Sequence, residues 1–382
     1  MENLSSEHLK NLISKIFPHM ETDLKLAILV DVPDNLVPDN EAWKVRRELA
    51  VGWASALDDV RKELKLVDIN LIFYQNVHNN NADLPESGYF YDGPTDELTF
   101  QKLCSIGSEV EMDTVFESHQ LFLAPTEFSP TAPLKLAAQK YGFRAATMPG
   151  FAPAMLPALK QDYDEIGHRV RRIKSLVDNA IGAEINFLLE DDEHLQLYLD
   201  LRFREGHESG GIFPKKGMAG NLPSGECYIV PYEGEQEESN SSGFLPVQFG
   251  DEIVIYKIEN NRAVFVTSSG PMSMQEEQKI IKEPAYANLA ELGFGVLGDF
   301  GIKPVGEILL DEKLGLHIAF GRSDHFGGII GVKDFSNPFA VEHLDRIYIP
   351  ETQPKVHVIS VVLILQDGER LILMDEGKYT IF

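Results

Sequence analysis

Leu26-Ala27-Ile28-Leu29-Val30-Asp31-Val32 is the stretch that decides the fold of the first half of the chain. Its aliphatic residues, interrupted only by Asp31, predict a β-strand. Three further short runs predict strands, at 67–74, 120–124 and 143–147. Between these strands, apolar residues recur at helical spacing over 41–64, around 97–110 and over 133–141. This alternation predicts a Rossmann-like α/β domain with a mostly parallel sheet.

A proline-rich passage at 149–157 marks the predicted end of this domain, which spans residues 1–157. The segment 163–180 then predicts a basic amphipathic helix, and beyond it the chain becomes rich in strands, beginning with 195–203. Hairpins are predicted over 251–266, turning at Asn260-Asn261, and over 356–382, turning at Asp367-Gly368 and Glu376-Gly377. The second domain, 158–382, is therefore expected to be α+β with an antiparallel sheet.

The composition limits the partners of this protein. The chain of 382 residues has 34 Lys and Arg against 60 Asp and Glu, a net charge of −26, which argues against nucleic acid as the main partner. Cys104 and Cys227 lack the spacing of a disulfide framework or a thiolate metal site, which predicts a reducing, cytoplasmic location. The longest apolar run, 358–365, is far shorter than the ~20 residues that span a bilayer, so no membrane segment is expected.

Two local patterns are given structural interpretations. The acidic, serine-rich stretch 233–242 predicts a mobile surface turn. The segment 293–298, Gly-Phe-Gly-Val-Leu-Gly, matches the G-x-G-x-x-G pattern of dinucleotide-binding turns. Such a turn follows a strand and opens a helix, whereas 286–291 has a helical pattern and 302–306 contains a proline. A dinucleotide site is therefore not expected.

Side chains that can bind a metal ion gather between residues 220 and 345. They lie in four segments beside glycines or predicted strand ends, at 220–226, 289–293, 315–321 and 342–345. In the last of these, His343 and Asp345 are two residues apart and point to the same side of an extended strand. The set of two histidines, two glutamates and an aspartate suits zinc, cobalt, manganese or iron.

Four blocks resemble, in order, those of the M29 metallo-aminopeptidases of the aminopeptidase T type, over about residues 160–382: 220–226, 289–295, 310–313 followed by 317–321, and His343-x-Asp345. The resemblance implies a dinuclear site that binds two divalent ions (Zn, Co or Mn) and a homodimeric enzyme. The implied ligands are Glu226, Glu291, His317, His343 and Asp345. One position departs from the family: the tyrosine ligand expected seven residues after His317 is replaced by Asp324, which is followed by His325. We expect Asp324 to lie at the metal site, with His325 as the alternative.

The first functional hypothesis is a two-metal hydrolase that removes N-terminal residues from short peptides or acts on a small amide. Glu312 is the candidate proton shuttle, although helix capping or a salt bridge with Lys313 would also explain it. A second hypothesis is a mononuclear non-haem iron ring-cleaving dioxygenase of related fold, using His317, His343 and Asp345. A third is a non-catalytic binding module. The presence of both Glu226 and Glu291 favours two metal ions and therefore the hydrolase.

Overall fold

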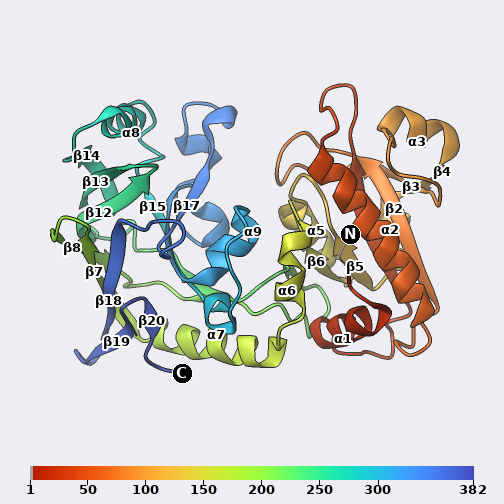
Figure 1. Ribbon diagram of the computed structural model, residues 1–382, viewed down its shortest axis with the longest axis horizontal. Helices are drawn as coiled ribbons and strands as arrows, with labels where there is room; N and C mark the ends of the chain where they lie inside the picture. The colour runs from red at the N-terminus through yellow and green to blue at the C-terminus, as the bar shows by residue number, and fades with distance from the viewer. Residues whose placement is uncertain (1–2) are drawn as a thin grey trace. The chain divides into compact units, whose positions relative to one another are not determined.

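The computed structural model describes residues 3–382, which form two compact units (Figure 1). The first unit consists of Met1–Gly167 and Gly211–Ser224, and the second of His168–Gly210 and Gly225–Phe382. The chain thus passes between the units more than once, whereas the sequence places a single boundary after residue 157. None of the helices in the described part of the chain is both long and apolar enough to cross a membrane.

The first unit is built on a mostly parallel sheet, as the sequence predicts. Its strand order is β10-β6-β5-β1-β2-β3-β4, and the pairs from β10 to β2 are parallel whereas β3 and β4 are antiparallel. The strands are β1 (Lys25–Val32), β2 (Asp68–Gln75), β3 (Ser87–Phe90), β4 (Ser108–Glu111), β5 (Leu121–Ala124), β6 (Arg144–Thr147) and β10 (Ala219–Asn221). The predicted α/β class of this half is confirmed.

Helices connect these strands. They are α1 (Ser6–Ile16), α2 (Glu41–Asp59), α3 (Phe100–Ile106), α4 (Met112–Ser118), α5 (Thr131–Tyr141), the 3-10 turn η1 (Pro153–Met155), α6 (Leu156–Leu159) and the start of α7 (Tyr163–Val177). The Asn40 side chain caps α2 by accepting the N–H of Trp43 at 2.8 Å, and α2 packs on β1 and β2. The predicted helix over 97–110 is wrong at its end, because Gly107 terminates α3 and 108–111 pairs with β3 as a strand.

Asp31, the polar residue within the aliphatic run, has a structural role. Its carboxylate is fully buried and accepts the N–H groups of Glu127 and Phe128, at 2.8 and 3.0 Å, and the indole N–H of Trp43 at 3.0 Å. Burial raises the pKa of Asp31 to about 6, although these hydrogen bonds oppose the shift. Asp31 therefore fixes the loop after β5 to the end of β1.

The second unit contains two antiparallel sheets. The larger has the order β14-β13-β12-β8-β7-β18-β19-β20, and the smaller has the order β17-β16-β15-β11-β9. The larger sheet is formed by β7 (Ala180–Leu189), β8 (His194–Asp200), β12 (Ser242–Phe249), β13 (Glu252–Glu259), β14 (Arg262–Val266), β18 (Val356–Leu365), β19 (Arg370–Asp375) and β20 (Lys378–Tyr379). The smaller is formed by β9 (His207–Ser209), β11 (Glu226–Ile229), β15 (Leu289–Gly295), β16 (Leu316–Gly321) and β17 (His343–Ile347).

Turns and short helices complete this unit. The predicted hairpin turn at Asn260-Asn261 is confirmed, since both residues have positive φ angles, of 49° and 64°, as a tight hairpin turn requires. Helix α8 (Pro271–Lys282) packs on β13 and β14 (Figure 1). The remaining short helices are η2 (Leu297–Phe300), α9 (Ile308–Asp311), η3 (Glu312–Leu314), η4 (Asp324–Phe326), η5 (Val332–Asp334) and η6 (Pro338–Ala340).

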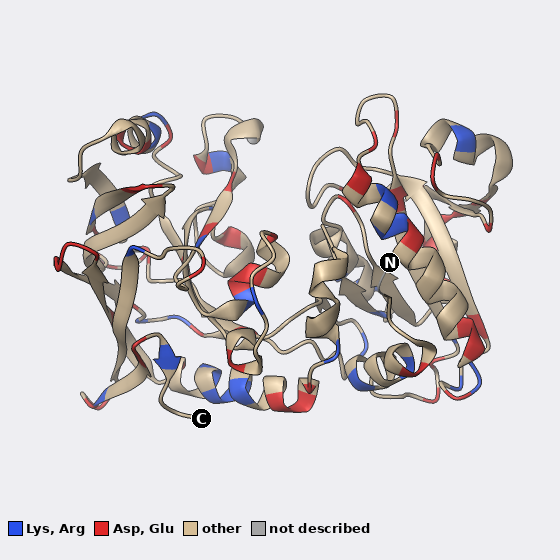
Figure 2. Ribbon diagram, in the orientation of Figure 1, with Lys and Arg blue, Asp and Glu red and all other residues tan. Residues whose placement is uncertain are grey.

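The basic stretch of α7 lies on an amphipathic helix, as predicted. In Figure 2 the ribbon of α7 is coloured for acidic residues at its start and for basic residues further along it. Arg171 and Arg172 are exposed, whereas Ile173 and Val177 are buried. The positive charges therefore lie on the side of the helix that faces solvent.

The helical pattern predicted over 286–291 is wrong, because Leu289–Gly295 forms the central strand β15. This strand is buried along its whole length, so its sequence lacks the alternation that identifies a half-buried strand. The glycines of the G-x-G-x-x-G match serve packing. A Cβ atom on Gly293 would lie 1.9 Å from His317 Nε2, and one on Gly295 would lie 2.1 Å from the carbonyl carbon of Lys313.

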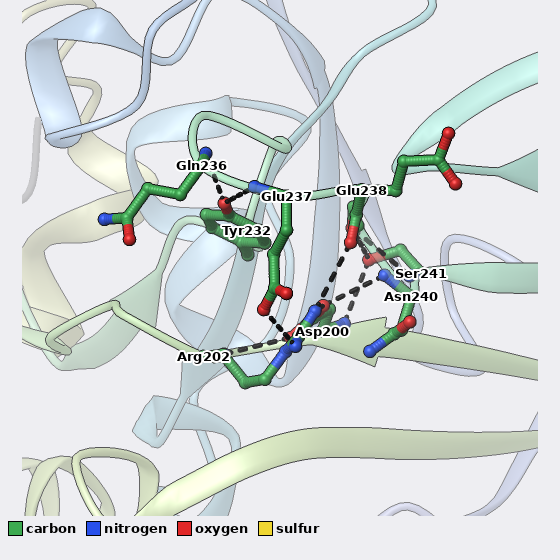
Figure 3. A network of polar contacts seen from close by, with 9 residues as sticks. Asp200, Arg202, Tyr232, Gln236, Glu237, Glu238, Asn240 and Ser241 are labelled. Atoms are coloured by element: carbon green, nitrogen blue, oxygen red, sulfur yellow. Dashed lines mark hydrogen bonds and ion pairs between the residues drawn. The ribbon is translucent and has the colours of Figure 1, made fainter.

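The acidic stretch 233–242 is a loop held by hydrogen bonds rather than the expected mobile surface turn (Figure 3). The buried Asp200 carboxylate accepts the N–H of Asn240 at 2.9 Å. The Tyr232 hydroxyl accepts the N–H of Gln236 at 2.6 Å. Composition predicts exposure here, but these hydrogen bonds to neighbouring strand ends fix the loop to the body of the unit.

Candidate metal centre

The smaller antiparallel sheet projects the candidate ligands from one face. Residues paired across antiparallel strands point to the same side, and so do residues two apart within a strand. Ala319 pairs with Glu291 on one side and Asp345 on the other. Further pairs are Gly293 with His317, Gly295 with Glu226, and Gly321 with His343. All five ligands that the family resemblance implies therefore share this face.

The five side chains form two groups of potential ligand atoms. The first consists of Glu226, Glu291 and His317, and the second of Glu291, His343 and Asp345, with the atoms of each group within 4.8 Å of one another. Glu291 belongs to both groups. Its Oε1 lies 3.2 Å from His317 Nε2, and its Oε2 lies 3.2 Å from His343 Nε2.

The outer members of each group are only slightly further away. Glu226 Oε2 lies 3.6 Å from His317 Nε2, and Asp345 Oδ1 lies 3.6 Å from His343 Nε2. Each histidine nitrogen thus stands between two carboxylates. The two groups therefore each offer one nitrogen and two carboxylates, and they share Glu291.

Burial makes this concentration of negative charge costly without a compensating cation. Burial opposes ionisation of Glu291, yet hydrogen bonds from His317 and His343 hold the pKa of its carboxyl well below the usual value. Burial likewise disfavours the charged His317, but Glu291 and the neighbouring carboxylates raise its pKa to about 9. Protons on the histidines therefore balance the carboxylates, as bound cations would.

The residues present fit divalent metal ions. Glu226 Oε2 is buried and has no hydrogen-bond partner among the residues that the structure describes, although buried carboxylate oxygens are normally paired. The donors are imidazole nitrogen and carboxylate oxygen, which suit zinc, cobalt, manganese and iron. An ion held by Glu226, Glu291 and His317 would satisfy the unpaired oxygen.

Lys313 is a component of the centre that the sequence reasoning treats only as a salt-bridge partner of Glu312. Its side chain is 1% exposed, and its Nζ lies 2.6 Å from Glu226 Oε1 and also contacts Glu312. Burial raises the pKa of Glu312 to about 8. Lys313 therefore occupies one oxygen of Glu226 and leaves the other directed toward His317.

Asp324 does not join either group of ligand atoms within residues 3–382, contrary to the expectation for this position. It lies in η4, is exposed, and accepts a hydrogen bond from Arg322 Nε at 2.6 Å. The same turn instead directs rings toward the centre. The rings of His325 and Phe326 both lie 5.4 Å from the ring of His343.

Tyr228 is an aromatic residue of this face that the sequence analysis missed. It lies two residues after Glu226, so strand periodicity alone places both side chains on the same side. Its ring lies 4.7 Å from that of Phe326 and stacks on His207 at 5.1 Å. Burial raises the pKa of the Tyr228 hydroxyl well above its ordinary value, so the phenol stays protonated.

Comparisons with known proteins agree on the fold. No protein-family model and no curated protein sequence matches this chain. The structure of 2,5-dihydroxypyridine dioxygenase from Pseudomonas putida KT2440 is similar, with a TM-score of 0.61, 13% identity and 99% of each chain covered. Wild-type AmpT from Thermus thermophilus is also similar, with a TM-score of 0.57, 13% identity and 98% of each chain covered. At these identities the likeness concerns the fold.

Proposed function

We propose that this protein is a metal-dependent hydrolase of the aminopeptidase type that holds two divalent ions. The observation that carries the proposal is the sharing of Glu291 between the two ligand groups, with one carboxylate oxygen toward each histidine. A carboxylate that bridges two ions is a feature of two-metal hydrolytic sites. The likeness to AmpT supports the same class, since AmpT is of the aminopeptidase T type that the sequence motifs resemble.

Different residues of the chain would bind the ions, orient a ligand and transfer a proton. Glu291 would hold both ions, while Glu226 with His317 and Asp345 with His343 would complete the two sites. Bound ions would activate a water molecule and polarise the scissile carbonyl. Lys313 orients Glu226, and Glu312, half-buried beside Lys313 and outside both ligand groups, is the carboxyl available to transfer a proton.

The donors at the centre also suit the proposed substrate. A bound ion would accept the lone pair of a neutral α-amine, and Glu312, which belongs to neither ligand group, is a carboxylate beside the ions. A peptide would therefore bind through its N-terminus, which gives exopeptidase specificity.

The alternative is a mononuclear iron dioxygenase, which the likeness to 2,5-dihydroxypyridine dioxygenase supports at the level of the fold. That activity needs His317, His343 and Asp345 to bind one ion. Within the described residues, His317 is grouped with Glu226 and Glu291, whereas His343 and Asp345 form the other group with Glu291. This separation favours two ions over one.

Metal analysis combined with a peptidase assay tests the proposal. The purified protein, loaded with zinc, cobalt or manganese, should bind about two ions per chain and release N-terminal residues from short peptides. Glu291→Gln should lower the content of both ions and abolish cleavage, whereas Glu117→Gln, an exposed control, should change neither. One ion per chain, together with oxygen uptake on a dihydroxylated ring by the iron-loaded protein, would establish the dioxygenase instead. If the protein shows neither activity, the hypothesis of a non-catalytic binding module remains.

A further inference from the structure

Five rings form a connected cluster at one side of the candidate metal centre. His207 stacks on Tyr228, Tyr228 contacts Phe326, and Phe326 lies against His325 with ring centres 3.9 Å apart. The rings of Phe326 and His325 both contact the candidate ligand His343 at nearly right angles. We call these residues, His207, Tyr228, His325, Phe326 and His343, the aromatic cluster. It joins the sheet face to the turn η4.

The turn that carries His325 and Phe326 is fixed at several points. Glu233, only 2% exposed, accepts hydrogen bonds from Ser323 Oγ at 2.5 Å and from the N–H of Ile329 at 2.6 Å. On the sheet side, a ring nitrogen of His207 lies 2.9 Å from the carbonyl oxygen of Phe326. The rings are thus held in place before any ligand arrives, which lowers the entropy cost of binding.

The groups around the centre differ in chemistry. Glu226, Lys313 and Glu312 carry charges, which an apolar group cannot approach without loss of solvation. Tyr228, two residues after Glu226 on β11, and Phe326, which lies against His343, instead present aromatic rings, and both residues are partly exposed. A substrate side chain next to the metal-bound end can therefore contact an aromatic surface.

We propose that the aromatic cluster binds an aromatic ring of the substrate, so that the centre selects peptides with an N-terminal phenylalanine or tyrosine. This inference rests on the proposed function. Ring pairs in edge-to-face or offset geometry add to the effect of apolar burial alone. The gain for an aromatic ring over a saturated ring of equal size is expected to be about 2- to 10-fold in affinity.

The test uses inhibitors that chelate the metal, so that binding is measured without turnover. Isothermal titration of the zinc-loaded protein compares the hydroxamates of L-phenylalanine, L-cyclohexylalanine and L-leucine. The phenylalanine compound should bind about 2- to 10-fold more tightly than the cyclohexylalanine compound, which has similar size and no π-system. Equal affinities would overturn the proposed selectivity and leave the metal centre standing.

Variants locate the effect. Phe326→Leu should remove the preference for the aromatic ring, and Tyr228→Leu repeats the test from β11 in case the first variant does not fold. Phe339→Leu is the matched control, because Phe339 lies in the same connection between β16 and β17 but is 94% exposed. The Phe339→Leu variant should show the same preference for the phenylalanine compound as the unmodified protein. A preference that persists in both Phe326→Leu and Tyr228→Leu would refute the assignment, and no binding of any hydroxamate would refute the metal centre and this inference together.

Discussion

If the centre holds two ions as proposed, Gly293→Ala should remove one of them without changing any ligand. The added Cβ would lie 1.9 Å from His317 Nε2, and Gly293 has no positive φ angle, so the effect is steric rather than conformational. A non-bonded contact of this kind needs about 3.5 Å, so the imidazole must retreat by about 1.6 Å. A zinc–nitrogen bond of about 2.0–2.1 Å does not tolerate such a displacement. An ion held by Glu226, Glu291 and His317 would therefore be lost.

Stability should fall as well, because His317 is fully buried and has little room to move. Overpacking of this kind costs about 1–3 kcal/mol. Elemental analysis of Gly293→Ala should give about one ion per chain instead of two, and calorimetry should give a Tm lower by several degrees. Gly52→Ala is the control, since its Cβ would meet only the flexible side chain of Asn3. Two retained ions and an unchanged Tm in Gly293→Ala would refute this account of the site.

Three further predictions concern metal binding, Asp324 and pH. Removal of metal with a chelator should lower the Tm, and zinc at 100 times its dissociation constant should then raise the free energy of unfolding by about 2.7 kcal/mol. An unchanged Tm in both steps would show that the centre binds no ion. Asp324→Asn should keep the full metal content, because Asp324 pairs with Arg322; loss of an ion would place Asp324 in the site. Burial raises the pKa of Asp31 from 3.8 to about 6, so its stabilising contribution is complete below pH 3.8 and is lost as the pH rises through 6. Denaturant unfolding at pH 4 and pH 7.5 should show this contribution of about 3 kcal/mol, and Asp31→Asn should abolish it.

Much of the fold follows from local pattern. The aliphatic runs that become β1, β2, β5 and β6 are separated by helical segments, which is sufficient to predict a parallel sheet. Asn260-Asn261 and Glu376-Gly377 predict their hairpin turns because asparagine and glycine tolerate positive φ angles. The strand β15 was missed because complete burial removes the alternation by which strands are recognised.

The sequence by itself determined which residue types are available for a metal centre, since the resemblance of its blocks to those of the aminopeptidase T type implies the two histidines and three carboxylates as ligands. It could not determine how they meet. The register of β15 against β16 and β17 directs Glu291 toward both histidines and brings Gly293 against His317. Contacts between segments far apart in the chain also bury Lys313 beside Glu226 and place the ring of Phe326 beside His343. Asp324 pairs with Arg322 instead of joining the ligand groups. Only tertiary structure decides these features, because local periodicity gives the direction of a side chain along its own strand and not its neighbours on the next.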